Sequence, residues 1–278
     1  MPQLIAYLNG SYLPLSQAKV SVLDRGFLFG EGVYEVVYHH AGKPIAMQDH
    51  ELRLKRSLDE MRIAQPTENL CDISLKLIAD QGIANAKIYW HITRGVDLTR
   101  QHIPDKNIKP TVLVIAWPEP DHAIAQGPET IKALLTPDIR WQRCDIKSTM
   151  LAPNCLAKQR ASKLGFQEAI FHRDQIVTEG TSTCLFIIKD GKLQTHPLDH
   201  WILPSITRKQ IIQIALQHQI PVIEKPFTIE QMLEADEVLI GSTTTIIATI
   251  THIDEHPIAD GKSGAFAKQF FTWFFEQA

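Results

Sequence analysis

Several short segments of the chain have the composition and spacing of β-strands. Asn9-Gly10 separates "LIAYL" from "SYLPL", and an Asn-Gly pair between apolar segments predicts a hairpin because both central residues take positive φ. Segments rich in β-branched and aromatic residues predict further strands, with Asp190-Gly191 as a second hairpin turn. These segments are "AKIYWHITRG" and "PTVLVIAW" in the first half of the chain, and "IKALLTP", "QEAIFHR", "CLFII" and "KLQTHP" in the second.

Two helices are predicted in the first half. Leu54, Leu58 and Met61 recur at i, i+4 and i+7, which predicts one buried helix face within residues 48–63. Another helix is predicted over about residues 67–82.

Helix signals become prominent late in the second half. Ser205 precedes "ITRKQIIQIALQHQ" as a predicted N-cap, and the apolar residues of that segment form a helical stripe. Thr228 and Gln231 have the spacing of a capping box for a short helix, and "GAFAKQFFTWFFEQ" predicts an amphipathic helix. With the strands, this pattern indicates a mixed α+β fold.

The length of 278 residues predicts two domains, at roughly 100 to 200 residues per domain. The segment "PEPDHAIAQGPE", residues 118–129, combines prolines, a glycine and charges, and is the best candidate for a linker. We therefore expect an N-terminal domain over residues 1–120 and a larger C-terminal domain over residues 121–278.

Composition narrows the class of protein. The formal net charge is −3 and no long Lys/Arg run occurs, which argues against a nucleic-acid partner. No apolar run approaches the roughly 18 to 20 residues that span a bilayer, so we expect no membrane insertion.

The four cysteines form no C-x-x-C pair and "MPQLIAYLNG" lacks an export pattern, which predicts a reduced, cytoplasmic protein. His252 and His256 in "HIDEHP" are the best candidate metal ligands, but Asp254 and Pro257 indicate a turn there, so no metal is expected.

The segment "CDIKSTM", residues 144–150, contains the most informative lysine. Lys147 follows an apolar isoleucine and precedes two small hydroxyl residues. A lysine in this position is either a solvated charge or, if partly desolvated, an amine nucleophile with a lowered pKa. Spacing alone leaves both interpretations open.

Seven segments together resemble the class IV, fold-type IV pyridoxal-phosphate aminotransferases, and most of all their D-amino acid aminotransferase branch. They occur in the family's order and spacing and extend over nearly the whole chain. The segments are "DRGFLFGEGVYEV", "HELRL", "RQH", "DIKS", "VTEGTST", "ILPSITR" and "GSTTT". The resemblance implies transamination between D-amino acids and 2-oxo acids such as 2-oxoglutarate.

The resemblance also implies how pyridoxal 5'-phosphate is bound. Lys147 is expected to form a Schiff base with the cofactor and then to move the proton at the substrate Cα, since only a primary amine serves both purposes. Glu179 is expected to face the pyridine nitrogen and keep it protonated. Arg53 matches the family's phosphate-binding arginine. The other expected cofactor-binding residues are Ser182, Leu203, Ile206, Thr207, Ser242 and Thr243.

Substrate binding is implied by the R-x-H pair of the family. Arg100 and His102, with Tyr34 and Val36 of the "GVYEV" segment, are expected to bind the substrate, because a guanidinium binds a carboxylate bidentately. In the family this pair comes from the second subunit, so the resemblance implies a homodimer with a shared active site. As an isolated pair in a polar loop, the two residues would instead be a solvated surface patch.

Some positions depart from the family pattern, and alternatives stay open. Cys184 stands where many members have Asn, Pro204-Ser205 replaces Asn-Gly, and Trp90-His91 differs near the substrate side. The main alternative is 4-amino-4-deoxychorismate lyase, which shares the cofactor residues, followed by branched-chain aminotransferase. A non-catalytic cofactor carrier is the alternative from another class, against which the retained R-x-H pair argues.

Overall fold

The computed structural model describes residues 4–119 and 127–277. It divides into two compact units, one made of Met1–Asp121 with Ile146–Met150 and the other of His122–Asp145 with Leu151–Ala278. Most of the expected linker, residues 120–126, lies outside the described residues. Ile146–Met150 belongs to the first unit although it lies beyond the expected boundary, because Ile146 is buried in the hydrophobic core of that unit.

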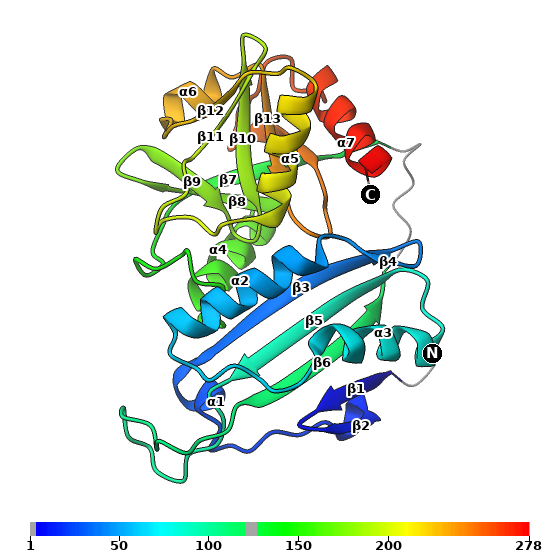
Figure 1. Cartoon of the computed structure of the whole chain (residues 1–278). Coiled ribbons are helices and arrows are strands. Elements are labelled where there is room, and N and C mark those ends of the chain that lie inside the picture. The colour runs from blue at the N-terminus through cyan, green and yellow to red at the C-terminus, as the bar shows by residue number, and fades with distance from the viewer. Residues whose placement is uncertain (1–3, 120–126, 278) are drawn as a thin grey trace. The chain divides into compact units, whose positions relative to one another are not determined.

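The first unit contains an antiparallel sheet of six strands in the order β2-β1-β6-β5-β3-β4 (Figure 1). The predicted hairpin is confirmed, since its two strands pair around Asn9 and Gly10, whose φ angles are 46° and 91°. The strands are β1 (Ile5–Leu8), β2 (Ser11–Pro14), β3 (Gly32–His40), β4 (Lys43–Pro44), β5 (Ala86–Thr93) and β6 (Thr111–Pro118).

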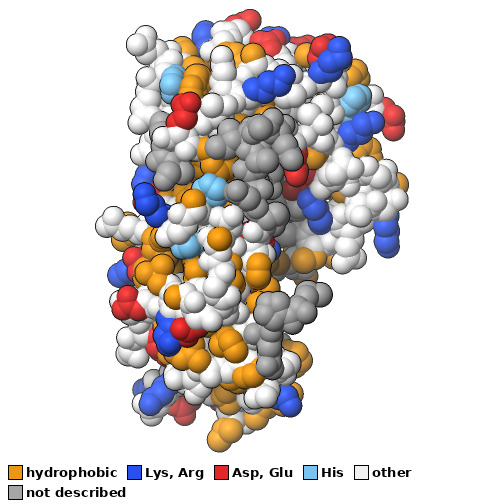
Figure 2. Space-filling view, turned by 90° about the vertical axis from the view of Figure 1, so that its right-hand side faces the viewer, with side chains coloured by type: hydrophobic (Ala, Val, Ile, Leu, Met, Phe, Trp, Pro, Cys, Tyr) orange, Lys and Arg blue, Asp and Glu red, His pale blue; other side chains and the backbone are white. Residues whose placement is uncertain are grey.

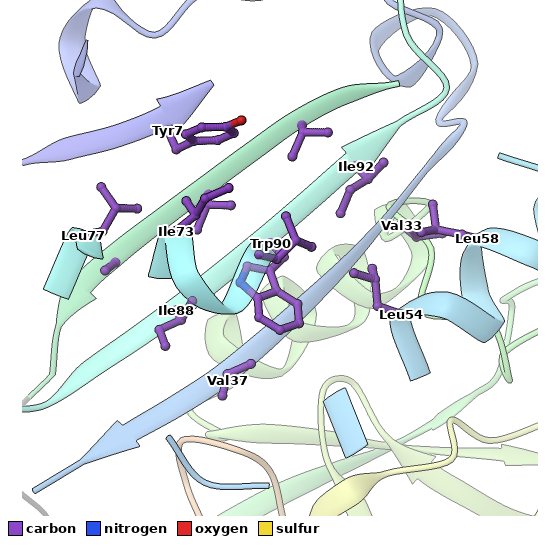
Figure 3. Close-up of a cluster of buried hydrophobic side chains, with 14 of the residues drawn as sticks. Tyr7, Val33, Val37, Leu54, Leu58, Ile73, Leu77, Ile88, Trp90 and Ile92 are labelled. Carbon is purple, nitrogen blue, oxygen red and sulfur yellow. The ribbon is translucent and has the colours of Figure 1, made fainter. Parts of the chain in front are cut away.

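Two amphipathic helices, α2 (Met47–Glu60) and α3 (Leu70–Gln81), pack against this sheet and confirm the two helices predicted here. Figure 3 shows Leu54 and Leu58 of α2 and Leu77 of α3 in one cluster with Trp90 of β5. The Trp90 indole N–H donates to the buried Ser74 Oγ over 2.8 Å, so its polar atom is satisfied inside the core. Two short helical segments, η1 (Leu15–Gln17) and α1 (Arg25–Phe29), precede β3.

The second unit is built on a mixed sheet of nine strands, in which β12-β11-β10-β13-β14-β7-β8-β9 are neighbours and β15 pairs with β14. Its β11–β12, β14–β7 and β7–β8 pairs are parallel and the others antiparallel. The strands are β7 (Glu129–Pro137), β8 (Glu168–Arg173), β9 (Ile176–Gly180), β10 (Cys184–Lys189), β11 (Lys192–Thr195), β12 (Val222–Glu224), β13 (Glu237–Gly241), β14 (Ala248–Ile253) and β15 (His256–Pro257).

The turns of this sheet follow the sequence signals. Asp190 and Gly191 both take positive φ between β10 and β11, as the predicted hairpin requires. The "HIDEHP" segment forms the hairpin of β14 and β15, with Asp254 at a φ of 51°. His252 and His256 therefore do not share a helix face, in agreement with the predicted turn.

Among residues 127–277, four helices flank the second sheet: α4 (Ala152–Lys163), α5 (Ile206–Gln217), α6 (Ile229–Leu233) and α7 (Ala265–Gln277). The predicted caps are confirmed. Ser205 Oγ accepts the Arg208 N–H over 3.1 Å, and Thr228 with Gln231 forms a capping box. The helices α5 and α7 lie side by side in Figure 1, and the rings of His218 and Trp273 stack with centroids 3.6 Å apart.

Charges of both signs are interspersed on the face of the molecule shown in Figure 2. Such mixing differs from the clustered positive charge that binds phosphate backbones. Within residues 4–119 and 127–277, no helix combines the length and hydropathy that a membrane-spanning helix needs.

Candidate active site

The backbone around Lys147 is fixed against β3. Tyr34 N–H donates to the Lys147 carbonyl over 3.0 Å, and Thr149 N–H donates to the Gly32 carbonyl over 2.9 Å. The Lys147 N–H in turn donates to Ser57 Oγ over 3.3 Å. These bonds hold Lys147 in an irregular segment beside the strand that carries Tyr34.

The Lys147 side chain is partly buried, and its Nζ lies 4.4 Å from the centre of the Tyr34 ring. An ammonium over an aromatic face is stabilised by the ring quadrupole. The structure therefore brings together two of the predicted site residues, the lysine and the tyrosine. Lys158, the other lysine nearby in the sequence, is half-exposed on α4 and forms an ion pair with the buried Glu168.

Strand β3 divides its side chains between two environments. Tyr34 and Val36 are partly exposed on one face, whereas Val33, Glu35 and Val37 are buried on the other. Of the unusual Trp90-His91 pair, His91 stands opposite Tyr34 in the sheet and Trp90 belongs to the core. Only His91 thus shares the face of Tyr34, whereas the Trp90 side chain lies on the opposite face of the sheet.

A buried charge network lies on the opposite face of β3. Arg53 donates from Nε and Nη2 to the two carboxylate oxygens of Glu35 over 2.7 and 2.8 Å, and His50 Nδ1 lies 2.7 Å from Glu35 Oε2. Burial raises the pKa of the Glu35 carboxyl, but the Arg53 charge and the hydrogen bonds outweigh it and lower that pKa to about 2. Burial lowers the pKa of His50.

Sequence reasoning identified Arg53 but missed Glu35. His50 and Arg53 are three residues apart on α2, so both point toward the same face of β3. The signal was the alternation in "GVYEV", which gives Glu35 the side opposite to Tyr34. Strand β3 was not among the predicted strands because a charged residue, Glu35, occupies a position on its buried face.

Arg100 and His102 are exposed in the connection between β5 and β6. Both contact Phe29 of α1. The Arg100 guanidinium carbon lies 5.2 Å from the centre of the Phe29 ring, and the His102 ring packs edge-on at 5.9 Å. The two predicted substrate residues are therefore neighbours around one aromatic side chain.

In the second unit, the Glu179 carboxylate is buried in β9. Its Oε1 accepts from Arg140 Nη1 over 2.6 Å and its Oε2 accepts from the Leu203 N–H over 3.1 Å. Burial raises the pKa of Glu179, while the Arg140 charge and both hydrogen bonds oppose that rise. The two predicted residues Glu179 and Leu203 are thus in direct contact.

Arg140 is a member of this cluster that the sequence analysis missed. It binds Asp138 through Nε and Nη2 over 2.9 and 2.8 Å, and its guanidinium carbon lies 4.5 Å from the centre of the Phe171 ring. Arg173 donates to the same aspartate over 3.0 Å. The segment "TPDIRW" that contains Asp138 and Arg140 shows no periodicity or motif by which the pairing could be found.

Four of the predicted cofactor-binding residues, Ile206, Thr207, Ser242 and Thr243, lie at or near the beginning of α5. Gly241, at the end of β13, is so close to this helix that an added Cβ would lie 3.0 Å from Thr207 Cγ2. Ser242 follows directly, and its Oγ accepts the Thr245 N–H over 3.1 Å. Ile206 and Thr207 in the first turn of α5 are thereby brought near Ser242 and Thr243. Ser182 is exposed in the bend between β9 and β10.

These observations agree with comparisons to known proteins. The model of the class IV amino-transferase family matches residues 32–253, so the chain belongs to the class IV aminotransferases. The chain is 39% identical over 272 residues to the D-alanine aminotransferase of Staphylococcus epidermidis, an alignment that covers 96% of this chain and 95% of that protein. It is 41% identical over 273 residues to the D-alanine aminotransferase of Listeria monocytogenes serotype 1/2a, with 97% and 94% covered.

Among solved structures, the branched-chain amino acid aminotransferase from Escherichia coli superposes with a TM-score of 0.88 at 25% identity. The superposition covers 98% of this chain and 93% of that one. The mixed α+β fold expected from the sequence is thus confirmed as the fold of these aminotransferases.

Proposed function

We propose that the chain is a pyridoxal-phosphate-dependent aminotransferase that exchanges an amino group between D-amino acids of the D-alanine type and 2-oxo acids such as 2-oxoglutarate. The observation that carries the proposal is the 39% and 41% identity, over nearly the whole chain, to two proteins named D-alanine aminotransferase. Its membership in class IV supports the same reaction type.

The phosphate-side residues fit the cofactor by their chemistry. A phosphate needs oriented N–H and O–H donors, and the first N–H groups of an α-helix have no partner within the helix. Ile206 and Thr207 open a helix of 12 residues, and Ser242 and Thr243 add hydroxyl groups beside that helix end. By the family resemblance Arg53 would add a positive charge, and Glu35 binds two of its nitrogens.

The cofactor supplies an aldehyde that receives the amino group and a ring that delocalises electrons from the substrate Cα. Glu179 would accept a hydrogen bond from its pyridine nitrogen, and a buried carboxylate suits that role because its negative charge keeps the nitrogen protonated. Leu203 would pack behind the ring and Ser182 would add a polar contact. Lys147 would attach the cofactor through its amine and then move the proton at the substrate Cα.

Arg100 and His102 would bind the substrate carboxylate, with Tyr34 and Val36 lining the same site. The planar fork of an arginine suits a carboxylate. Both side chains contact the Phe29 ring, which places them close enough together for one substrate carboxylate to contact both. The Tyr34 ring lies 4.4 Å from the Lys147 amine, so this substrate residue is beside the reacting lysine.

We further propose a cytoplasmic homodimer in which Arg100 and His102 serve the partner's site. Arg100 and His102 are exposed, and large apolar side chains around them are exposed as well: Leu98 by 85%, Ile103 by 82% and Phe27 by 72%. Exposed apolar groups of this kind are typical of surfaces that another protein covers. The scattered cysteines support the proposed reduced, cytoplasmic location.

The comparisons give no support to the 4-amino-4-deoxychorismate lyase alternative. Branched-chain aminotransferases share the fold, but the identity of 25% to such a structure is well below the identity to the D-alanine aminotransferases. We therefore propose the D-amino acid aminotransferase activity in preference to the lyase and branched-chain aminotransferase activities.

A substrate panel tests the proposal. The purified yellow holoenzyme is mixed separately with D-alanine, L-alanine, an L-branched-chain amino acid and aminodeoxychorismate, while the cofactor spectrum and the products are followed. The proposal predicts loss of the yellow absorbance and formation of pyruvate with D-alanine. A response to the L-branched-chain amino acid alone, or pyruvate from aminodeoxychorismate alone, would replace it with one of the two alternatives.

A further inference from the structure

Arg25 is a completely buried arginine behind the R-x-H loop, which we define as residues 97–102 between β5 and β6. It opens α1, whose N-cap Asp24 accepts the Gly26 N–H over 2.8 Å and the Thr111 hydroxyl over 2.7 Å. The backbone of Arg25 is therefore fixed to the sheet. Its guanidinium is a charged group without access to solvent, which needs a set of partners to be stable.

Two of these partners are backbone carbonyls of the R-x-H loop. Arg25 Nη1 donates to the Gln101 carbonyl over 2.6 Å, and Nη2 donates to the His102 carbonyl over 3.1 Å. Nη1 also binds Asp97 over 3.2 Å, and Asp97 Oδ1 accepts the Thr99 N–H over 3.1 Å. One guanidinium thus holds the loop at both ends, before Arg100 and after it.

The face of the same guanidinium contacts Phe29. The Arg25 guanidinium carbon lies 4.6 Å from the centre of the Phe29 ring, and the Arg100 guanidinium carbon lies 5.2 Å from it. His102 contacts the ring edge-on. Phe29 therefore connects the buried arginine to both side chains that the proposed function assigns to the substrate carboxylate.

Arg94 provides an internal comparison. Like Arg25, it forms an ion pair with Glu31. Its other donors reach the carbonyls of Met61 and Arg62, at the end of α2, and not the R-x-H loop. The two arginines thus share one carboxylate but support different segments of the chain.

We propose that Arg25, with Phe29, is a positioning element that fixes the R-x-H loop for recognition of the substrate carboxylate. The inference rests on the proposed function, in which Arg100 and His102 bind that carboxylate. A flexible loop would lose binding energy to the ordering of its backbone and of the Arg100 side chain, whereas a loop held beforehand does not. Arg25 acts through the loop and contacts neither substrate nor cofactor.

The test compares kcat and KM for D-alanine in holoenzyme variants Arg25→Gln, Arg25→Lys and Phe29→Leu. We expect Arg25→Gln to raise KM by about tenfold with kcat within about threefold, because carboxylate binding acts in the ground and transition states alike. Arg25→Lys and Phe29→Leu should raise KM less, and they keep the test valid if Arg25→Gln does not fold. Hydrogen exchange of residues 97–102 should accelerate in all three, with unchanged cofactor absorbance.

Arg94→Gln is the matched control, since it removes the same kind of pairing to Glu31 without touching the loop. The Arg94→Gln variant should leave the KM for D-alanine and the hydrogen exchange of residues 97–102 close to the wild-type values. In an Arg100→Ala background, Arg25→Gln should add little further rise in KM, because the group it positions is gone. A full additional rise in that background, or an unchanged KM in every Arg25 and Phe29 variant, would overturn the positioning role.

The proposed function fails in a different way. If Arg100→Ala alone leaves KM for D-alanine unchanged, the carboxylate site itself is wrong, and the role of Arg25 falls with it. If Arg100→Ala raises KM while the Arg25 and Phe29 variants do not, only the positioning role is refuted.

Discussion

Arg140 donates a 2.6 Å hydrogen bond to the buried carboxylate of Glu179, the residue proposed to face the cofactor nitrogen. Burial raises the pKa of Glu179, and Arg140 is the main influence against that rise. Asp138 fixes Arg140 from the other side. The ionised state of Glu179, on which the proposed chemistry depends, therefore rests on a residue outside every recognised motif.

Replacing Arg140 should change the pH dependence of turnover. In Arg140→Gln the positive charge is lost, so the pKa of Glu179 rises further and the carboxylate becomes protonated at higher pH. The acidic limb of the kcat/KM profile should therefore move to higher pH. Arg173→Gln is the control, because Arg173 also binds Asp138 but does not contact Glu179. An identical shift in both variants, or none in either, would contradict this account.

Glu179→Gln should keep the cofactor but lose most of the transamination activity. Glutamine can still accept a hydrogen bond, but it carries no charge to keep the pyridine nitrogen protonated. We expect kcat to fall by about 100-fold or more, the order of magnitude seen when a group that stabilises developing charge is removed. Cofactor content is measured by absorbance and kcat with D-alanine. Wild-type turnover in a fully loaded variant would disprove the role of Glu179.

Local signals in the sequence were sufficient for much of the fold. The Asn9-Gly10 hairpin, the helices α2 and α3 and the Ser205 cap follow from turn chemistry, apolar spacing and capping, which act over a few residues. Strand β3 was missed because Glu35 occupies its buried side. Its burial depends on α2, which lies outside any local window.

The residues of the candidate site also differ in whether a local sequence signal predicts them. Lys147, Glu179 and Arg53 were predicted because each lies in a short motif of a known family. Their supporting residues, Glu35 and Arg140, pair across 18 and 39 positions of the chain. Such pairs appear only when the fold brings distant segments together, and a single sequence carries no signal for them.

Glu35 should make the stability of the protein depend on pH. Its pKa falls from the ordinary value of 4.5 to about 2 in the folded state, so its contribution is complete above about pH 4.5 and is lost as the pH falls toward 2. The shift corresponds to about 3 kcal/mol. Glu35→Gln should therefore lower the urea midpoint at pH 7 and flatten its decline below about pH 4.5. A wild-type profile in the variant would refute this assignment.

The R-x-H loop should act across a dimer interface. Arg100→Ala is expected to raise KM for D-amino acids by about tenfold or more, with intact cofactor absorbance, because a bidentate contact to the carboxylate is lost. An isolated heterodimer of Arg100→Ala with Lys147→Ala then holds one site with both residues and one with neither, so it should show about half of the wild-type activity. A heterodimer that shows the raised KM of the Arg100→Ala parent would show that loop and lysine act within one chain.

The most direct test of the central claim, that Lys147 carries the cofactor in a D-amino acid aminotransferase, is borohydride reduction followed by peptide mapping. Reduction of the untreated holoenzyme should attach the pyridoxyl group to Lys147. Prior incubation with D-alanine should abolish that label, because the cofactor leaves the lysine when it takes up the amino group, whereas prior incubation with L-alanine should leave the label in place. A label on Lys158 or on no lysine, or a label that survives D-alanine, would contradict the account.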